Sequence, residues 1–521
     1  MPSAMRVFEA RAEGLQLSRE LATKATYFGP LDVLERELGI VAVPLVQVLA
    51  ACASSTVALG LAARWLELER ADLVIAGGYD ALSVFIAAGF EALGATSAAE
   101  PAPFRQQRDG MSLGEGAALV AMTRQGRATA PVLGHVVGFG ASSDAVHITA
   151  PDREGAGLAR AARAALADAG LSGTEIDLVS AHATATPFND LAEAKAISAT
   201  LGESARPVVH PFKAVIGHTL GAAGALELLA ALDALQRGVL PAAVGSGEPE
   251  PQLVGRMLTH NESGTPNTCL KLSAAFGGAN AALVIAREPA RGRARPRRSV
   301  GLLAVGEPVE EFDLARVLSI ATAPREKLER LDALSCLVVG AAAAALRRLP
   351  PRTSDTLGVV VGTAAATLEI NELFDARRRE RGARFVEPRR FPPTSPNLAP
   401  GQCAIAFGLR GISLAVGASP AAATEALLVA YDLLEAGDAE SLLVIAAEQV
   451  GQVVIDVWTA AGWPLPRHGA AALVLAAGQG RSLDRDRLLE AHAKAVAGEG
   501  RLYPSDVGFP TLLSALEAAL A

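Results

Sequence analysis

The sequence predicts an α/β protein built from two related segments, and three observations support this class. Short apolar runs that suit buried strands alternate with longer amphipathic runs that suit helices. This alternation is typical of βαβ units, in which helices cover both faces of a mostly parallel sheet. The same pattern repeats after a basic, proline-rich stretch, and a chain of 521 residues is too long for one ordinary core.

The expected strands follow the chain in order. They are residues 73–76, 117–122, 132–139, 178–180, 270–273, 359–361, 414–416, 442–446 and 472–476. Amphipathic helices are expected at residues 158–169 and 190–201. Another apolar run, at residues 48–59, predicts a short strand that turns directly into an Ala-rich helix.

The domain boundaries follow from composition. The stretch from Arg287 to Arg298 is basic, rich in Pro and without apolar periodicity, so we expect a linker at residues 288–299. A nucleic-acid-binding patch is the alternative interpretation of this stretch. A first domain is expected at residues 1–287, a second at 300–481, and a tail ending in a helix at 482–521. Both domains contain a strand, a helix and a Gly-Ala-Ala-Leu-Val-type strand, which indicates an internal repeat.

Composition and charge exclude several classes of function. A net charge of −8 and an aromatic content of 4% argue against binding of nucleic acid. Four scattered cysteines and the lack of a His cluster at ligand spacing argue against disulfides and a metal site, and they fit a reducing cytoplasm. The longest weakly polar run, residues 334–346, is too short to span a membrane, and no export signal opens the chain. We therefore expect a cytoplasmic protein without a metal or a cofactor.

Cys52 is the candidate nucleophile. It stands where the strand turns into the helix, among backbone N–H groups at the positive end of the helix dipole. Both features favour the thiolate, so we expect a reactive sulfur here. An isolated Cys in an apolar run is otherwise a small buried residue.

Two histidine motifs lie downstream of this cysteine. The first, Ser180-Ala-His182-Ala-Thr-Ala-Thr, follows a strand and precedes a helix, which places the imidazole at a strand end, where α/β folds usually bind ligands. The second, Lys213-Ala-Val-Ile-Gly-His218, precedes a helix with small residues that permit close backbone packing. Each histidine alone is as compatible with a structural role as with catalysis. Both histidine motifs together with Cys52, however, form a pattern that is highly specific for a catalytic site.

At these residues the chain resembles the β-ketoacyl synthases, the decarboxylating condensing enzymes of the thiolase fold. The matching motifs stand in the family's order within residues 25–287. They are Ala50-Ala-Cys52-Ala-Ser-Ser, Arg108-Asp-Gly110, Gly114-Glu-Gly116, Ser142 to Pro151, His182-Ala-Thr-Ala-Thr, Lys213 to His218 and Phe276-Gly-Gly-Ala-Asn280. The resemblance implies a layered α-β-α-β-α fold with mixed five-stranded sheets.

The resemblance also implies the roles of individual residues. Cys52 would carry the acyl group, and His182 and His218 would stabilise the enolate. Lys213 and its acidic partner Glu227 would order the site. The oxyanion hole would use the backbone N–H groups of Cys52 and Phe276, and the Phe276 side chain would gate the acyl pocket. The expected supporting residues are Asp190, Thr184 and Thr186.

The implied activity is a decarboxylative Claisen condensation between malonyl carrier protein and an acyl thioester on Cys52, in type II polyketide or fatty-acid biosynthesis. The expected partners are acyl carrier protein and a second ketosynthase-like subunit, in a homodimer or a heterodimer. A catalytically inactive scaffold that shapes a pocket for a separate synthase is the alternative function.

The sequence departs from the family in two places. The motif His182-Ala-Thr-Ala-Thr has Ala where the family has Gly, which costs little unless the backbone requires a positive φ. The first two strands and first helix of the N-terminal half have no counterpart before the segment that begins near Met5. Either these strands are lost from the start of the recorded sequence, which we favour, or residues 300–370 supply them to the catalytic segment.

The second domain resembles the N-terminal half of a chain-length factor, the non-catalytic partner in type II polyketide systems. Pro420 occupies the nucleophile position, Ser419 stands beside it, and no second histidine pair follows. Thiolase-fold proteins pair through the strand that leads to the nucleophile. We therefore expect residues 45–50 to face residues 414–417 across a pseudo-two-fold interface, either within this chain or between two chains.

Overall fold

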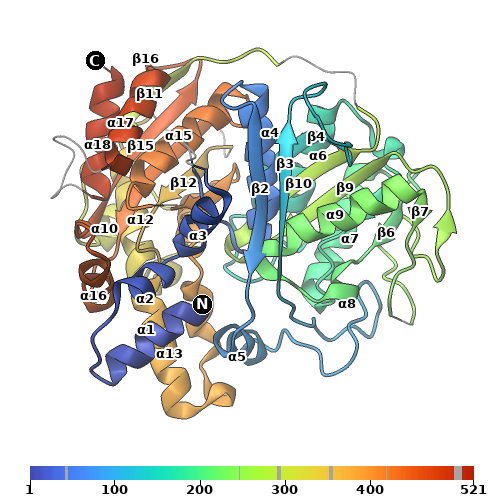
Figure 1. Ribbon diagram of the computed structural model, residues 1–521, viewed down its shortest axis with the longest axis horizontal. Helices are drawn as coiled ribbons and strands as arrows, with labels where there is room; N and C mark the ends of the chain where they lie inside the picture. Colours follow the sequence, from blue (N-terminus) through green and yellow to red (C-terminus); the bar gives the residue numbers. More distant parts are fainter. Residues whose placement is uncertain are drawn as a thin grey trace. The chain divides into compact units, whose positions relative to one another are not determined.

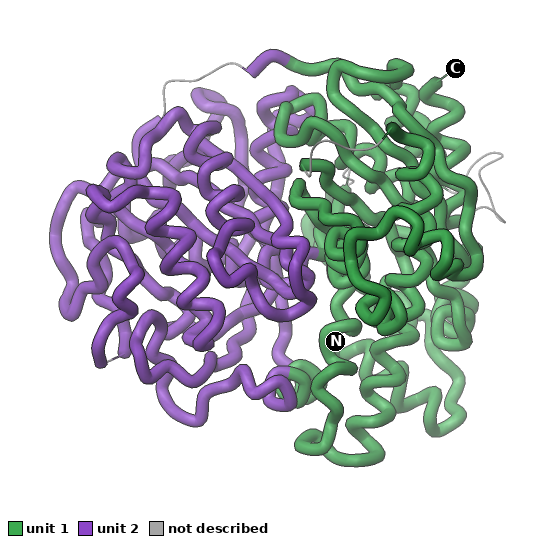
Figure 2. Tube along the Cα trace, turned by 180° about the vertical axis from the view of Figure 1, so that it is seen from behind, with its two compact units in different colours: residues 1–49, 83–89, 297–521 green, residues 50–82, 90–296 purple. Residues whose placement is uncertain are grey.

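The computed structural model describes residues 1–40, 45–245, 247–289, 295–350, 356–417, 419–497 and 507–520. The chain divides into two compact units, which Figure 2 shows in different colours. Unit 1 contains residues 1–49, 83–89 and 297–521, and unit 2 contains residues 50–82 and 90–296. The units therefore differ from the linear boundaries 1–287, 288–299, 300–481 and 482–521, and part of the expected linker lies outside the described residues.

Unit 2 contains a five-stranded mixed sheet in the order β4-β10-β9-β5-β6. The β4–β10 and β10–β9 pairs are antiparallel, and the β9–β5 and β5–β6 pairs are parallel. Its elements are α4 (Ser54–Glu67), β2 (Leu73–Asp80), β3 (Gly116–Thr123), β4 (His135–Ser143), α6 (Ala156–Ala169), β5 (Leu178–Ser180), α7 (Pro187–Leu201), β6 (Val208–His210), α8 (Lys213–Ile216), α9 (Ala223–Arg237), β7 (Val239–Leu240), β8 (Glu262–Ser263), β9 (Thr268–Ala274) and β10 (Ala279–Ala286).

The strands β2 and β3 form a separate antiparallel ribbon in unit 2, and within the described chain they pair only with each other. One face of the ribbon is buried, and α4 contacts both strands. The other face leaves three large apolar side chains exposed, with relative exposures of 60% for Leu73, 40% for Ile75 and 44% for Leu119. A ribbon with apolar residues on a solvated face is a recognised site of association.

Unit 1 contains a seven-stranded sheet in the order β1-β13-β12-β14-β15-β11-β16. Its elements are α1 (Pro2–Ala12), α2 (Arg19–Lys24), α3 (Gly29–Leu38), β1 (Val48–Leu49), β11 (Val300–Val305), α10 (Leu314–Leu318), α11 (Arg325–Leu328), α12 (Ala333–Leu346), β12 (Gly358–Gly362), α13 (Leu368–Arg381), α14 (Leu398–Phe407), β13 (Ser413–Val416), α15 (Ala422–Glu435), β14 (Ser441–Glu448), α16 (Gln452–Ala461), β15 (Gly469–Ala477), β16 (Arg481–Ser482), α17 (Arg485–Ala497) and α18 (Phe509–Leu520). The helix α5 (Val84–Ala92) begins in unit 1.

The strands of residues 300–370 belong to this sheet of unit 1. β11 pairs with β15, and β12 lies between β13 and β14 in parallel register. The helices α12 and α15 pack against the sheet, and α17 and α18 pack against α15 (Figure 1). The hypothesis that residues 300–370 complete the sheet of the catalytic segment is therefore wrong, because their backbone hydrogen bonds are used within unit 1.

The expected pairing of the two nucleophile-type strands is confirmed. β1 pairs antiparallel with β13, with Val48 opposite Val416 and Leu49 opposite Ala415. β1 is shorter than the predicted residues 45–50, since only two residues have ladder geometry. This pairing brings β1 into the sheet of unit 1, whereas the nucleophile turn that follows at Ala50 belongs to unit 2.

The first helices of the chain pack into unit 1 because their apolar residues are buried there. Phe8, Val7 and Ala22 have no exposed surface, and they lie in one core cluster with Trp458 and Val457 of α16. The Arg11 Nε donates to Glu372 Oε1 at 2.7 Å. These contacts explain why the unit boundaries differ from the linear domain boundaries.

All nine predicted strands are present, although 132–139 begins later, at His135. The expected tail helix is α18. The prediction of mostly parallel sheets is wrong in detail, because both larger sheets contain antiparallel pairs.

Within the described residues, no helix combines the length and the apolar character needed to cross a membrane.

Candidate active site

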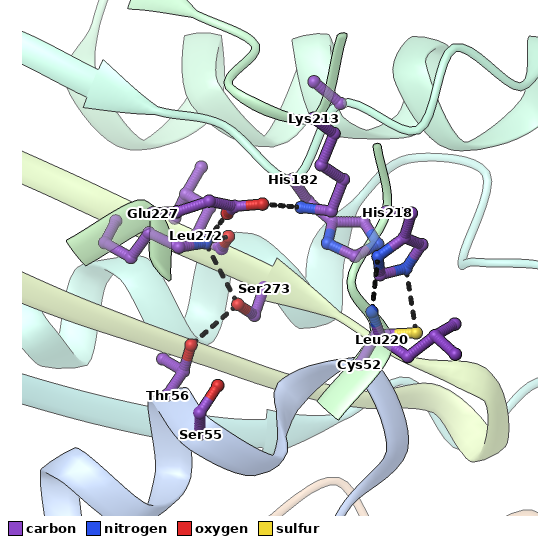
Figure 3. A network of polar contacts seen from close by, with 12 residues as sticks. Cys52, Ser55, Thr56, His182, Lys213, His218, Leu220, Glu227, Leu272 and Ser273 are labelled. Carbon is purple, nitrogen blue, oxygen red and sulfur yellow. Dashed lines mark hydrogen bonds and ion pairs between the residues drawn. The ribbon is translucent and has the colours of Figure 1, made fainter. Parts of the chain in front are cut away.

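Cys52 lies in a 3₁₀ turn, Ala51–Ala53, between β1 and α4 rather than on the helix itself. Ala51 has a φ of 45°, so the backbone turns sharply immediately before the nucleophile. The Sγ atom of Cys52 lies 3.0 Å from Nε2 of His218. Figure 3 marks this contact with a dashed line between the two side chains. The turn and the helix thereby present the sulfur directly to an imidazole.

The hydrogen bonds of His218 determine its tautomer. The backbone N–H of Leu220 donates to Nδ1 at 3.2 Å, so Nδ1 carries a lone pair and the proton of the neutral ring is on Nε2. Nε2 therefore donates toward the Cys52 sulfur. Gly217, with a φ of 76°, holds the preceding turn close to Gly114, where a Cβ would lie 2.9 Å from the backbone. This close approach explains the glycine before His218.

His182 lies on the loop that leaves the carboxyl end of β5. Its ring centroid is 5.5 Å from that of His218, with the two planes nearly perpendicular. The carboxylate of Glu193 on α7 accepts from the backbone N–H of His182 at 2.6 Å and of Ala183 at 2.7 Å, and so fixes the loop. Nδ1 of His182 is buried without a hydrogen-bond partner among the described residues. An unpartnered imidazole nitrogen leaves the ring with hydrogen-bonding capacity for a ligand or water.

A buried ion cluster lies beside the histidines. The Glu227 carboxylate contacts the Lys213 ammonium at 2.7 Å through Oε1 and the Lys271 ammonium at 2.8 Å through Oε2. These three side chains are at most 3% exposed. The Lys213–Glu227 pairing confirms the contact that the family resemblance implied.

Burial dominates the proton affinities of the site. Burial raises the pKa of the Cys52 thiol to about 12, although the Lys213 ammonium acts in the opposite direction. The expectation of a resting thiolate is therefore wrong, because the sulfur loses more solvation than nearby charges return. Burial, reinforced by Lys213, holds the pKa values of His182 and His218 well below the ordinary value of 6.5. Both rings are neutral at neutral pH.

The two alanines in the His182 motif adopt the left-handed backbone conformation. Ala183 has a φ of 42° and Ala185 a φ of 57°. The backbone of this loop requires a positive φ at both positions, which is the condition under which Ala in place of Gly costs stability. Each costs about 1–2 kcal/mol relative to a right-handed residue. The hydrogen bonds from the loop to Glu193 hold this strained conformation in place.

Phe276 stands at the start of a tight turn beside β10. Its ring lies 5.7 Å from that of Phe90, and the next two residues, Gly277 and Gly278, have φ values of 78° and 76°. Only glycine adopts these angles freely, so the turn depends on both residues. The Gly-flanked aromatic matches the position expected for a gate, and its movement remains a prediction.

The expected supporting residues hold neighbouring loops. Asp190 on α7 is fully buried and accepts from the backbone N–H of Phe104 at 2.8 Å. The hydroxyls of Thr184 and Thr186 are hydrogen-bonded to each other at 2.9 Å. Neither of these two hydrogen bonds involves Cys52, so these residues act on the shape of the site.

Sequence reasoning missed Glu193, Lys271 and the hydroxyl pair of Thr56 and Ser273, which lie 2.8 Å apart. Glu193 stands three residues after Asp190, on the same helical face, which is a signal that could have identified it. Lys271 interrupts a strand that is otherwise apolar, and a charge at such a position suggests a buried partner. No group of three or more possible metal ligands occurs in the part of the chain that the structure describes.

These features define a protein of thiolase-like fold with a Cys–His–His site supported by a buried Lys–Glu pair. The model for the N-terminal domain of β-ketoacyl synthases matches residues 41–128 and, a second time, residues 312–480. The model for the C-terminal domain of β-ketoacyl synthases matches residues 133–246. The chain belongs to the β-ketoacyl synthase family, and the double match agrees with the internal repeat.

Two curated relatives are similar over a little less than half of the chain. The chain is 35% identical over 258 residues to 3-oxoacyl-[acyl-carrier-protein] synthase 2 of Vibrio cholerae, covering 47% of this chain and 62% of that protein. It is 38% identical over 247 residues to nodulation protein E of Rhizobium meliloti, covering 46% and 61%. The chain thus spans less than two thirds of the length of either relative.

A solved structure extends the similarity of fold over nearly the whole chain. The PfaC keto synthase–chain length factor structure aligns with a TM-score of 0.70 and covers 91% of this chain and 65% of that chain. Its sequence identity is 19%, so this similarity concerns the fold alone.

Proposed function

We propose that this protein is a β-ketoacyl-[acyl carrier protein] synthase that joins an acyl group on Cys52 to a two-carbon unit from malonyl carrier protein. The observation that carries the proposal is the 3.0 Å contact between Sγ of Cys52 and the donor Nε2 of His218, with His182 beside it. The curated relatives named as 3-oxoacyl-[acyl-carrier-protein] synthases support the same reaction class.

In the first half-reaction, Cys52 attacks the carbonyl carbon of an acyl carrier-protein thioester. The new C–S bond forms as the bond to the carrier sulfur breaks, and the proton of the Cys52 thiol leaves with the carrier thiol. Because burial raises the pKa of Cys52, attack needs the thiolate to form as the acyl donor binds. The Nε2–H of His218 donates to the sulfur and stabilises this anion.

In the second half-reaction, malonyl carrier protein loses CO₂ and the electrons of the broken C–C bond pass into an enolate. The neutral rings of His182 and His218 donate to the enolate oxygen. The enolate carbon then attacks the acyl carbonyl, and the C–S bond to Cys52 breaks to regenerate the thiolate. The backbone N–H groups of Cys52 and Phe276 stabilise the intermediate oxyanion.

The partners follow from this chemistry. Acyl and malonyl thioesters are delivered by acyl carrier protein, which is named in the description of the 35% identical relative. A second ketosynthase-like subunit is the other proposed partner. Type II polyketide and fatty-acid biosynthesis both use this reaction, in the cytoplasm.

Unit 1 contributes no bond chemistry in this proposal. Pro420 stands two residues before α15, as Cys52 stands two residues before α4, and proline has no nucleophilic side chain. The neighbouring Ser419 hydroxyl donates to the Glu425 carboxylate at 2.6 Å. We expect Ser419→Ala to retain full condensing activity and deletion of residues 300–521 to abolish it. A soluble, fully active protein of residues 1–290 would contradict this role.

Product formation tests the function. Purified protein is incubated with acyl carrier protein charged with an acyl group and with malonyl carrier protein, and the carrier is analysed by intact mass. We expect β-ketoacyl carrier protein from wild type and from Cys336→Ala, and none from Cys52→Ala. Equal product from Cys52→Ala and wild type would refute the proposal.

A non-catalytic scaffold is the second candidate, and one observation favours it. The β2–β3 ribbon has two strands, whereas the corresponding β14 and β15 lie within a seven-stranded sheet and are covered on all sides. An incomplete sheet beside the nucleophile reduces the rigidity that catalysis needs. Enhanced product formation by a separate synthase on addition of the Cys52→Ala protein would support the scaffold.

A further inference from the structure

The loop that carries His182 is held against its own backbone strain. Ala183 and Ala185 both have a positive φ, of 42° and 57°, which is unfavourable for any residue with a Cβ atom. Glycine adopts these angles freely, and the family motif has Gly at both positions. In this chain the loop therefore keeps the left-handed conformation only because its surroundings compensate for the strain.

The Glu193 carboxylate provides this compensation. Glu193 stands on α7 and is 1% exposed. Its two oxygens accept from two consecutive backbone N–H groups, that of His182 at 2.6 Å and that of Ala183 at 2.7 Å. Hydrogen bonds to an ionised acceptor are roughly twice as strong as those between neutral groups. One of the two donors is the backbone of His182 itself, so the same carboxylate sets the position of the imidazole.

We propose that Glu193 is a positioning residue for decarboxylation: by holding two consecutive N–H groups of a strained loop, it keeps the His182 ring beside that of His218, where both donate to the enolate. The inference rests on the proposed function and adds a residue to it. Without this carboxylate, the strained alanines would relax and carry the imidazole away from its place, 5.5 Å from the His218 ring.

Acyl loading should depend on Glu193 far less than decarboxylation does. The 3.0 Å contact between Cys52 and His218, which supports the attack on the acyl thioester, lies outside the His182 loop. The ratio of decarboxylation to loading therefore separates a positioning role from a role in fold stability, because loss of the fold would lower both rates together.

Charged groups act on Glu193 from several elements. They are Asp190 on its own helix, Lys213 on α8 and Lys271 on β9, with the His182 loop above. Burial raises the pKa of Glu193 to about 7, and Asp190 acts in the same direction, whereas the two N–H groups and Lys213 oppose it. Burial also raises the pKa of Asp190 to about 6. A protonated Glu193 has one good acceptor for two N–H groups, so decarboxylation should decline as the pH falls through about 7.

The test compares the two half-reactions in matched variants. Glu193→Gln keeps the shape of the side chain but replaces one acceptor oxygen by a donor, and Glu203→Gln makes the same change at an exposed carboxylate just beyond α7. Glu193→Gln is also combined with Ala183→Gly, which relieves a positive φ, or with Ala181→Gly, which removes a buried methyl group where φ is not positive. Acyl loading is measured by peptide mass, decarboxylation of malonyl carrier protein by released CO₂, and opening of the loop by amide exchange.

We expect Glu193→Gln to lower decarboxylation by about 10- to 100-fold and loading by less than about threefold, because one buried N–H of the loop loses its acceptor. Amide exchange of the loop should increase in parallel. Adding Ala183→Gly should recover about 5- to 30-fold of the lost rate, the factor that strain at one residue represents, and adding Ala181→Gly should recover none. Glu203→Gln should match wild type.

The pH profile is a further readout. In wild type, the ratio of decarboxylation to loading should fall from about pH 8 to about pH 6, and in Glu193→Gln this fall should be absent. Asp190 titrates in both proteins, so the difference between the two profiles reports Glu193. Equal losses of loading and decarboxylation in Glu193→Gln, or equal recovery by the two glycine substitutions, would overturn the proposal.

If Glu193→Gln does not fold, wild type and the single variant Ala183→Gly decide. Relief of the strain makes the loop less dependent on the second hydrogen bond, so the fall of the ratio below about pH 7 should be smaller in Ala183→Gly. Superimposable profiles of these two proteins would overturn the proposal.

The inference and the proposed function fail in different ways. A wild-type protein that neither loads nor decarboxylates would refute the function, and amide exchange of the loop would then decide whether Glu193 holds it. An active wild-type protein whose ratio of decarboxylation to loading is unchanged by Glu193→Gln would refute the inference and leave the function intact.

Discussion

Replacing Phe8 by Ala tests whether the first helix is an integral part of unit 1. Phe8 has no exposed surface and packs in the cluster that contains Trp458 and Val457. Deleting a fully buried phenyl ring costs about 3–5 kcal/mol, from lost transfer free energy and the cavity left behind. At 1.4 kcal/mol for each factor of ten, the ratio of folded to unfolded unit 1 should fall by roughly two to three and a half decades.

Urea denaturation followed by tryptophan fluorescence measures this loss, because two of the three tryptophans, Trp458 and Trp463, lie in or against the cluster. Amide exchange of residues 1–24 shows whether α1 undocks before the rest of unit 1 unfolds. The matched control is Leu15→Ala, since Leu15 is 58% exposed and should change the free energy of unfolding by less than about 0.5 kcal/mol. A change below about 1 kcal/mol for Phe8→Ala, with unaltered exchange in α1, would refute the packing argument.

Two further predictions concern the active-site loops. Ala183→Gly should be more stable than Ala181→Gly by about 1–2 kcal/mol in thermal or chemical denaturation, because both lose a buried methyl group outside a helix but only the first relieves a positive φ. Equal losses would contradict the strain. The second prediction concerns the alkylation of Cys52 by iodoacetamide, measured in a Cys336→Ala background. The alkylation rate should increase about tenfold per pH unit from pH 7 to pH 10. A pKa of about 12 leaves the thiol protonated throughout this range, and only the thiolate reacts. A rate that is already constant above pH 8 would show that the sulfur is a thiolate at rest, and preferential labelling of Cys269 or Cys403 would remove Cys52 as the nucleophile.

Much of the fold could be predicted because strand periodicity and the internal repeat are local properties of the sequence. The nine apolar runs became strands, and the pairing of β1 with β13 was predicted from the resemblance to thiolase-fold proteins, which pair through the strand that leads to the nucleophile. The packing of residues 1–38 could not be predicted in this way. An amphipathic helix indicates that one face is buried, but not against which part of the chain, and here Phe8 packs more than four hundred residues away in sequence.

The active site, like the fold, could be predicted from the sequence only in part. Cys52, His182 and His218 stand in motifs whose residue types and order indicate the chemistry, and the structure brings all three together. The protonation state of Cys52 depends on burial that no local pattern reports. The backbone angles of Ala183 are likewise set by its contact with Glu193, and the place of Lys271 by a carboxylate on another element.

The most direct test of the central claim separates acyl loading from decarboxylation on the same enzyme samples. Wild type, Cys52→Ala, His182→Ala and His218→Ala are each incubated with acyl carrier protein substrate, and the acyl adduct is mapped by peptide mass. Malonyl carrier protein is then added, and the released CO₂ is measured. We expect an adduct on Cys52 in wild type and in both histidine variants, with CO₂ release lost in the two histidine variants. Loading of Cys52→Ala, or near-wild-type CO₂ release by His218→Ala, would contradict the assignment of the site.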